Sequence, residues 1–458
     1  MTEAAKTAER MSTLDMAASL VGRALKAGAD AAEAVAMEGT SLGVSWRLGK
    51  LEDVERSEGC DVGLRVFVGK RQASVSTTDL SEASLAPMIE RVVAMARAAP
   101  EDPYCGLADP ELLARDWPDL DIEDKSTPPA AEQLAGFAAE AEEAALAVAG
   151  VTNSSGAGAG WGRSGVALVT RPASGGGFAG SYAGTSCSIS CSVLAGEGTA
   201  MERDYDYMTA RHGQDLEGAA AIGRRAGEKA VKRLHPRKVR SQSVPVVYDP
   251  RVSGGLVGHF AGAISGTSIA RGTSFLKNDM GRAVFAKDIS IVDDPHMKRG
   301  LRSKPFDGEG VRNGRMLLVE DGRLTTWLLD SATARQLGLA TTGHAARGTG
   351  GPPAPAPTNL YMEAGCLKVK ELIADIKQGL YVTELIGMGV NGVTGDYSRG
   401  ASGFWIENGE IVYPVSEITI AGNLKDMFLN MTPADDLEFR HATNAPTIRV
   451  EGMTVAGT

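Results

Sequence analysis

Apolar and polar residues follow the same order of predicted elements twice in the first half of the chain. Residues 12–29 place apolar side chains at helical spacing behind a serine. Four short stretches between residues 32 and 78, each bounded by glycine, predict strands, and 81–99 predict a second helix. The order repeats as a helix over 130–150, strands over 151–207 and a helix over 214–234. The letters of the two blocks are unrelated, so no sequence repeat is indicated.

A third part begins at about residue 241 and is rich in strand and turn signals. Asp321-Gly322 and Asn408-Gly409 each separate two apolar stretches. These pairs tolerate the positive φ angles of a type I′ turn, so each predicts a β-hairpin. A short amphipathic helix is expected to end near Gly379.

The length and the linkers predict several domains. A chain of 458 residues is too long for one ordinary core. A segment rich in Pro and Asp at 100–129 is typical of a connector. We therefore expect domains at 1–115, 116–240 and 241–458. The predicted fold class is α+β, with N-terminal helix and strand layers followed by a β-rich, barrel-like C-terminal domain.

Composition narrows the class to a globular protein of the cytoplasm. The net charge of −10 argues against nucleic acid as a partner, and no apolar run approaches the roughly 18–20 residues that span a membrane. The segment 1–16 lacks the apolar stretch of a signal peptide. Five scattered cysteines fit a reducing compartment. Cys187 and Cys191 could share a strand face, where two buried small residues are favoured over a zinc site.

Local motifs for nucleotide or metal binding find little support. The glycine run at 156–165 suggests a dinucleotide loop, but a predicted strand follows it where such a loop needs a helix. Asp293, Asp294 and His296 form the best local set of metal ligands, and a polar turn explains them equally well.

A serine–histidine–acid triad can be assembled on paper but has no supporting spacing. Its members would be Ser398, His259 and either Asp307 or Glu309. Any chain of this length offers such a set, so the triad is kept only as an alternative.

Glycines recur every four residues along a predicted helix that begins at Asp249-Pro250 or Ser253. They stand at 254, 258, 262 and 266, and so drift slowly along one face. Each interior glycine costs roughly 0.5–1 kcal/mol relative to alanine. We therefore expect another backbone, within the fold or across a subunit interface, to approach this face. His259 beside it is favoured as a packed side chain over a metal ligand.

The segment 394–405 is a second candidate for function, with polar side chains between glycines followed by two aromatic residues. Its candidate residues are Asp396, Tyr397, Ser398, Arg399, Phe404 and Trp405. They could border a substrate channel in which an extended peptide adds as a strand. They could equally form a structural turn with an Asp–Arg pair, and both interpretations stay open.

Several segments after about residue 241 form a recognisable set: GLVGHFAGAISG, SKPFDGEGVR, TTGHA and above all the long segment 379–427. In these segments the chain resembles the TldD/PmbA family of bacterial zinc-peptidase subunits. The resemblance implies a helix that, in the catalytic kind of subunit, carries H-E-x-x-x-H. There two histidines bind zinc and the glutamate is the general base. A cysteine near the C-terminus completes the zinc ligands of that subunit.

This chain departs from the catalytic pattern at several positions. Gly254 and Gly255 stand where the resemblance places the first histidine and the glutamate, and His259 alone remains. No cysteine follows Cys366. The resemblance therefore implies the second kind of subunit, TldE or PmbA, with no catalytic residue and no metal of its own.

The expected function follows from this resemblance. We expect a heterodimer with a TldD-type subunit that holds the zinc, acting on peptides or unfolded polypeptides, with this chain as chamber wall and interface. One alternative is an independent hydrolase that uses Ser398 or Asp307. The other is a peptide-binding adaptor, as a homodimer, that does not cut.

Overall fold

The computed structural model describes residues 12–457, so most of the segment that bears on a signal peptide lies outside the described residues. The α-helices are α1 (Thr13–Lys26), α2 (Glu82–Ala98), α3 (Ala131–Leu146), α4 (Ala219–Lys232), α5 (Pro250–Ala263), α6 (Gly266–Ala270), α7 (Ser331–Leu337), α8 (Val369–Ile373) and α9 (Leu424–Leu429). The strands of the first half are β1 (Ala31–Arg47), β2 (Lys50–Val68), β3 (Arg71–Thr77), β4 (Val151–Pro172), β5 (Phe178–Ala195) and β6 (Glu202–Ala210). Those of the second half are β7 (Gln242–Tyr248), β8 (Ile291–Asp293), β9 (Met316–Glu320), β10 (Arg323–Leu324), β11 (Ala345–Ala346), β12 (Ala354–Pro355), β13 (Leu360–Met362), β14 (Gln378–Val390), β15 (Asp396–Glu407), β16 (Glu410–Asn423), β17 (Met431–Pro433), β18 (Thr443–Asn444) and β19 (Ile448–Ala456).

The two blocks of the first half share one antiparallel sheet with the strand order β3-β2-β1-β4-β5-β6. We expected short strands bounded by glycine, which is wrong for β1 and β2. Both strands run without a break through Gly39 and Gly59, which face each other in the ladder. Continuous pairing along both strands outweighs the local preference of glycine for turns.

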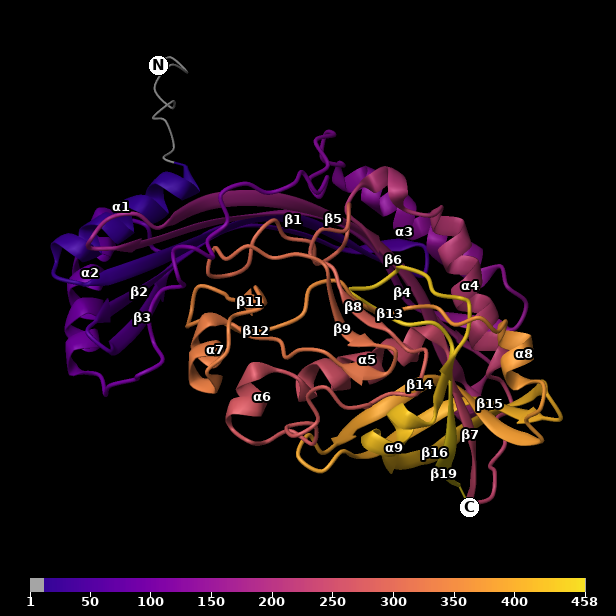
Figure 1. The fold of residues 1–458 in the computed structure, drawn as a ribbon. Helices are drawn as coiled ribbons and strands as arrows, with labels where there is room; N and C mark the ends of the chain where they lie inside the picture. Colours follow the sequence, from indigo (N-terminus) through magenta and orange to yellow (C-terminus); the bar gives the residue numbers. More distant parts are fainter. Residues whose placement is uncertain (1–11, 458) are drawn as a thin grey trace, which may run out of the picture.

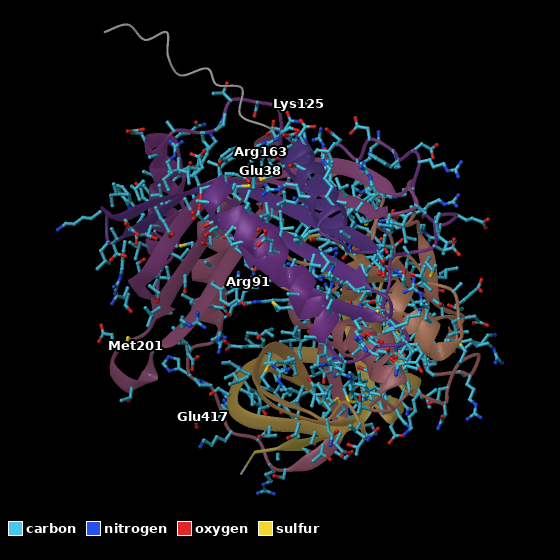
Figure 2. All side chains as sticks on the ribbon, turned by 90° about the vertical axis from the view of Figure 1, so that its left-hand side faces the viewer. Glu38, Arg91, Lys125, Arg163, Met201 and Glu417 are labelled. Carbon is cyan, nitrogen blue, oxygen red and sulfur yellow. The ribbon has the colours of Figure 1, made fainter. Side chains whose placement is uncertain are left out.

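The sheet arches over the rest of the molecule, with α1 and α2 on one end of its outer face and α3 and α4 on the other (Figure 1). Strand alternation explains the layers, because Ala34 and Ala36 of β1 pack beneath α1 and α2 while Val35 packs on the inner face. Glu38 and Arg163 lie side by side on the sheet, where their side chains form an ion pair of 3.1 Å (Figure 2).

The glycine run at 156–165 lies inside β4, which confirms that it is no dinucleotide loop. Ala157 and Ala159 face the core beneath α3 and α4. Gly158 and Gly160 face the other way, beside the serines of β5. The alternation of alanine and glycine therefore fits a strand whose alanine face packs in the core and whose glycine face carries no side chains.

The C-terminal part contains a closed barrel, so the predicted fold class is confirmed. Strands β16, β15, β14, β7 and β19 pair in that order, and β16 also pairs with β19. Both predicted hairpins are confirmed, with φ of 47° and 76° at Asp321-Gly322 and of 50° and 81° at Asn408-Gly409. The predicted helix near Gly379 ends earlier, at Ile373, because β14 takes over from residue 378. Within the described chain, no helix is both long and apolar enough to cross a membrane.

Candidate functional site

Helix α5 begins where its sequence predicts. Asp249 is the N-cap, and its side chain accepts a hydrogen bond from the backbone of Arg251. Pro250 occupies the first helical position, where its missing N–H costs nothing. Leu256, Val257 and Phe260 then pack into the core of the C-terminal part. The helix is thus fixed against the barrel by one apolar face.

The opposite face of α5 has almost no side chains. A Cβ atom added at Gly255, Gly258 or Gly262 would meet nothing within 4 Å. A Cβ at Gly254 would lie 2.9 Å from the backbone oxygen of Thr443. Within the described chain, a second backbone therefore approaches this series closely only at Gly254, and the predicted approach across a subunit interface stays a prediction. Gly255, Gly258 and Gly262 leave the backbone of α5 exposed at the surface of this chain.

Gly266, the last glycine of the series, is not part of this face. It lies in the separate short helix α6, where an added Cβ would meet the Thr333 hydroxyl at 2.6 Å. It is required for packing between α6 and α7, which is a structural role.

His259 lies beside the open glycines of α5. Its ring is half-buried and stands edge-on to Tyr397, with centroids 6.0 Å apart. Burial lowers the pKa of His259, and the nearby charge of Arg399 lowers it further. The imidazole is therefore neutral at neutral pH. Among the described residues, no group of three or more His, Cys, Asp and Glu side chains is placed to hold a metal ion.

The six candidate residues of β15 do not form one surface. Tyr397 and Trp405 are each 2% exposed and belong to the core, so neither is available to a substrate. Phe404 and Arg399 are half-buried, and Asp396 and Ser398 are exposed. Only these last four residues can border a channel.

The alternative of an Asp–Arg pair in this segment is wrong. Asp396 accepts hydrogen bonds from Thr394 at 2.6 Å and from Asn423 at 3.2 Å, and both lower its pKa. Arg399 instead donates to the backbone oxygen of Ile386 at 3.3 Å. The turn is held by these separate contacts.

The structure does not assemble the serine–histidine–acid triad. Neighbouring residues of a strand point to opposite faces, so Ser398 faces away from the side on which Tyr397 meets His259. Asp307 is 1% exposed, and its carboxylate accepts backbone N–H groups from Glu309, Val311 and Ala345. It serves as a structural acceptor and does not contact the histidine.

An exposed apolar hairpin end beside the candidate segment was missed. Ile386, Met388 and Val393 lie where β14 turns into β15, and they are 60%, 91% and 55% exposed. The ladder between the two strands breaks between Ile386 and Gly389, which turns Met388 outward. The run IGMGVNGV carries the signal, because its apolar residues alternate with glycines, which offer no side chain to pack against them.

The chain combines an arched antiparallel sheet, a closed barrel and a helix packed against that barrel (Figure 1). Family models described as domain 1, the central domain and the C-terminal domain of the PmbA/TldA metallopeptidases match residues 32–96, 115–234 and 241–457. The chain therefore belongs to the PmbA/TldD family.

Relatives and solved structures agree with this assignment over nearly the whole chain. Metalloprotease PmbA of Escherichia coli O157:H7 is 40% identical over 432 residues, which cover 93% of this chain and 92% of that protein. A PmbA homolog of Haemophilus influenzae is also 40% identical and covers 95% and 94%. A structure from Bacteroides thetaiotaomicron VPI-5482 has a TM-score of 0.87 at 26% identity, covering 98% and 100%. TldE from Thermococcus kodakarensis has a TM-score of 0.84 at 19% identity, covering 96% and 100%, and so shows the fold.

Proposed function

We propose that this chain is the non-catalytic subunit of a heterodimeric zinc peptidase in the cytoplasm. The observation that carries the proposal is the series of glycines along α5. Gly254 and Gly255 carry no side chain where a catalytic subunit needs a ligand and a base, and Gly258 and Gly262 leave the next turns bare. A catalytic zinc needs three protein ligands and one open position, whereas this helix offers a single imidazole.

The partner would supply zinc, base and attacking water, and this chain would supply a wall and an interface. The open face of α5 allows another backbone to approach closely, as glycine surfaces do. A second exposed feature is the hairpin end between β14 and β15. Its apolar residues Ile386, Met388 and Val393 are exposed. Exposed apolar groups of this kind mark interaction surfaces. Peptides or unfolded polypeptides are the substrates that such a shared chamber would admit.

The proposal is tested by purifying the chain alone and together with a TldD-type subunit. We expect the isolated chain to contain no stoichiometric zinc and to cleave no peptide. We expect the pair to copurify and to cleave peptides, with activity lost in a chelator and regained with zinc. Zinc bound tightly by the isolated chain, or cleavage without the partner, would overturn the proposal.

The adaptor alternative predicts a different result in the same experiment. The mass of the purified species in solution distinguishes the two. A stable homodimer that does not bind the TldD-type subunit would support the adaptor and contradict the heterodimer.

A further inference from the structure

The first sheet has an open edge along the first half of β2. Strand β1 pairs with β2 from residue 50 to residue 67, but β3 pairs only with residues 62–68. Among the described residues, residues 50–57 of β2 therefore have a neighbouring strand on one side and none on the other. Residues 51–59 are also all exposed. An edge of this kind can pair with a further strand.

The backbone along this edge offers unpaired hydrogen-bonding groups. Strands β2 and β3 are joined by the two-residue turn Gly69-Lys70, so the residues that flank the turn form a hydrogen-bonded pair. Even-numbered residues of β2 therefore direct their N–H and C=O groups toward the side of β3. Past the end of β3, those of Arg56 and Val54 have no backbone partner within the described chain. An extended polypeptide is the ligand that can pair with such a row of donors and acceptors.

The inner face of this edge carries negative charge. Val35 of β1 packs on the inner face of the sheet, and its register with β2 places the odd-numbered residues of β2 on the same face. Asp53 and Glu55 are two of these residues. Neither forms an ion pair with a described residue, in contrast to Glu52, whose carboxylate lies 4.0 Å from the Arg47 guanidinium. Both acids are therefore available to a cation of a ligand.

The inner face beside the two acids leaves room for long side chains. Ser45 and Gly43 of β1 lie opposite Asp53 and Glu55 in the ladder. A hollow of 840 Å³ begins at Ser57 and is lined mainly by glycine, serine and threonine. Because these neighbours are small, lysine or arginine side chains of an added strand can extend over this face without displacing packed groups.

The outer face of the same edge carries two exposed apolar side chains. Leu51 and Val54 are 50% and 42% exposed. They lie opposite Trp46 and Val44, which belong to the core beneath α3 and α4. Cross-strand pairs stabilise a sheet where opposite charges or apolar groups face each other. A strand that alternates basic and apolar residues would therefore match both faces of the edge.

The free end of the edge is already fixed in place. Glu142 of α3 is 2% exposed and accepts hydrogen bonds from the N–H groups of Leu48 and Gly49, both at 2.8 Å. These two residues form the turn between β1 and β2. A strand that is extended and held before binding loses little conformational freedom when a ligand pairs with it.

The charges of the edge exclude a second copy of this chain as the occupant. Residues 51–59 contain four acids and one arginine. Pairing of two identical edges would bring the acids of one copy beside those of the other, and like charges on neighbouring strands are destabilising. A basic strand meets no such repulsion.

We propose that residues 51–57 of β2 bind an extended basic peptide, which adds to the sheet as a strand. Its lysines or arginines, at every second position, would lie opposite Asp53 and Glu55 on the inner face. The apolar residues between them would pair with the backbone of Val54 and Arg56. Binding requires this chain alone, so the inference goes beyond the proposed peptidase role. In the proposed heterodimer, and resting on that proposal, the edge would favour basic polypeptides as substrates.

Fluorescence anisotropy of short labelled peptides with the full chain tests the proposal. We expect a peptide of alternating lysine and valine to bind saturably. A peptide of alternating glutamate and valine should bind at least about tenfold more weakly, because like charges would face each other. A peptide of alternating lysine and proline keeps the charge but lacks the N–H groups that would pair with β2. It should also bind at least about tenfold more weakly.

Charge reversal at the edge is the second part of the test. Asp53→Lys combined with Glu55→Lys should weaken binding of the lysine–valine peptide about tenfold and strengthen binding of the glutamate–valine peptide. Glu90→Lys combined with Glu143→Lys is the matched control. Both residues are exposed, lie on α2 and α3, and give the same change in net charge away from the edge. This control should keep the affinity of the original chain.

Three results would overturn the proposal. If the lysine–valine peptide does not bind saturably, the acids of the edge serve only to keep copies of this chain apart. If the lysine–proline peptide binds as tightly, charge alone attracts the peptide and no strand is added. If the reversal at Asp53 and Glu55 leaves the affinity unchanged, the peptide binds elsewhere. The comparison of peptides uses the original chain, without zinc or a partner, so neither misfolding of a variant nor failure of the partner experiment affects it.

Discussion

At the scale of single residues, His259 is best explained by packing against Tyr397. The ring is neutral and half-buried, and it makes an edge-on aromatic contact. Such contacts contribute about 0.5–1.5 kcal/mol. We expect His259→Ala to lower the free energy of unfolding by about 1–2 kcal/mol. In the complex with a TldD-type subunit, the zinc content should not change.

Urea unfolding and metal analysis of the complex check this prediction. His259→Phe serves as a control that keeps an aromatic ring and removes both nitrogens. Loss of zinc from the complex in either variant would show that His259 is a ligand and would contradict the packing role.

The buried carboxyl of Glu309 predicts how the stability of the fold depends on pH. It is 3% exposed, and burial together with Asp307 and Asp330 raises its pKa to about 8. The folded state therefore binds a proton that the unfolded state, with a pKa near 4.5, releases. The stabilisation is complete below pH 4.5 and is lost as the pH rises toward 8.

Glu309→Gln should remove this pH dependence, because glutamine keeps the acceptor for Ser331 and cannot ionise. We expect the variant to exceed the original chain in stability at pH 8 by on the order of a few kcal/mol. Asp307, with a pKa of about 6, leaves a smaller slope at lower pH. Denaturant titrations at several pH values measure the free energy of unfolding of each variant. Glu90→Gln is the control, because Glu90 is exposed. If the free energy of unfolding changes with pH in the same way for Glu309→Gln and for the original chain, the raised pKa of Glu309 is refuted.

At the scale of elements, turns and caps were predictable because their signals are local. Asp-Gly and Asn-Gly fix hairpins, and Asp249-Pro250 fixes the start of α5, whatever lies around them. The sharing of one sheet by two sequence blocks was not predictable. It depends on the pairing of β1 with β4, which brings Ala31 opposite Pro172, and no local pattern encodes that choice of partner.

The same distinction explains the site. The glycines of α5 indicated close contact with another backbone, but the sequence could not show which glycines face the chain's own core. Trp405 and Tyr397 were candidates for substrate contact because glycines lie near them in the sequence. In the structure both side chains are buried in the core of the C-terminal part. The hairpin end at Met388 depends on a break in the ladder that only the paired strands reveal.

The two faces of α5 predict opposite effects of the same substitution. Gly258→Ala should stabilise the isolated chain by about 0.5–1 kcal/mol, because its Cβ meets nothing and alanine favours a helix. Gly254→Ala should destabilise it, because its Cβ would lie 2.9 Å from the Thr443 oxygen. Thermal unfolding of both variants gives the comparison, and equal shifts would contradict the described placement of the helix.

A bulky residue on the open face tests assembly. Gly258→Trp should fold, because the face is empty within this chain, and should fail to copurify with a TldD-type subunit. Normal assembly of this variant would place the interface elsewhere.

At the scale of the whole molecule, a buried charge cluster joins the first sheet to a distant loop. Glu33 of β1 binds Arg347, which is 314 residues away in sequence. Arg65 of β2 lies directly opposite Glu33 in the ladder and binds the same carboxylate. Sequence spacing cannot predict such a cluster, because the fold alone brings the three side chains together.

Glu33→Gln should destabilise the docking of the C-terminal part on the sheet. Removing one partner of a buried ion pair costs about 3–5 kcal/mol, and here two guanidinium groups would lose their shared anion. The original chain should also lose this stabilisation in acid. Because the pKa of Glu33 is lowered, the stabilisation is present above the unfolded pKa of 4.5 and disappears as the pH falls through the folded pKa.

Chemical unfolding at neutral and acid pH measures both effects. The difference between Glu33→Gln and the original chain should be large at pH 7 and should shrink in acid, where the original carboxylate takes up a proton. Glu82→Gln is the control, because Glu82 pairs with Arg23 at the surface, where an ion pair contributes about 0–1 kcal/mol. A difference for Glu33→Gln that stays constant with pH would mean that volume and shape, and not charge, hold the sheet to the loop.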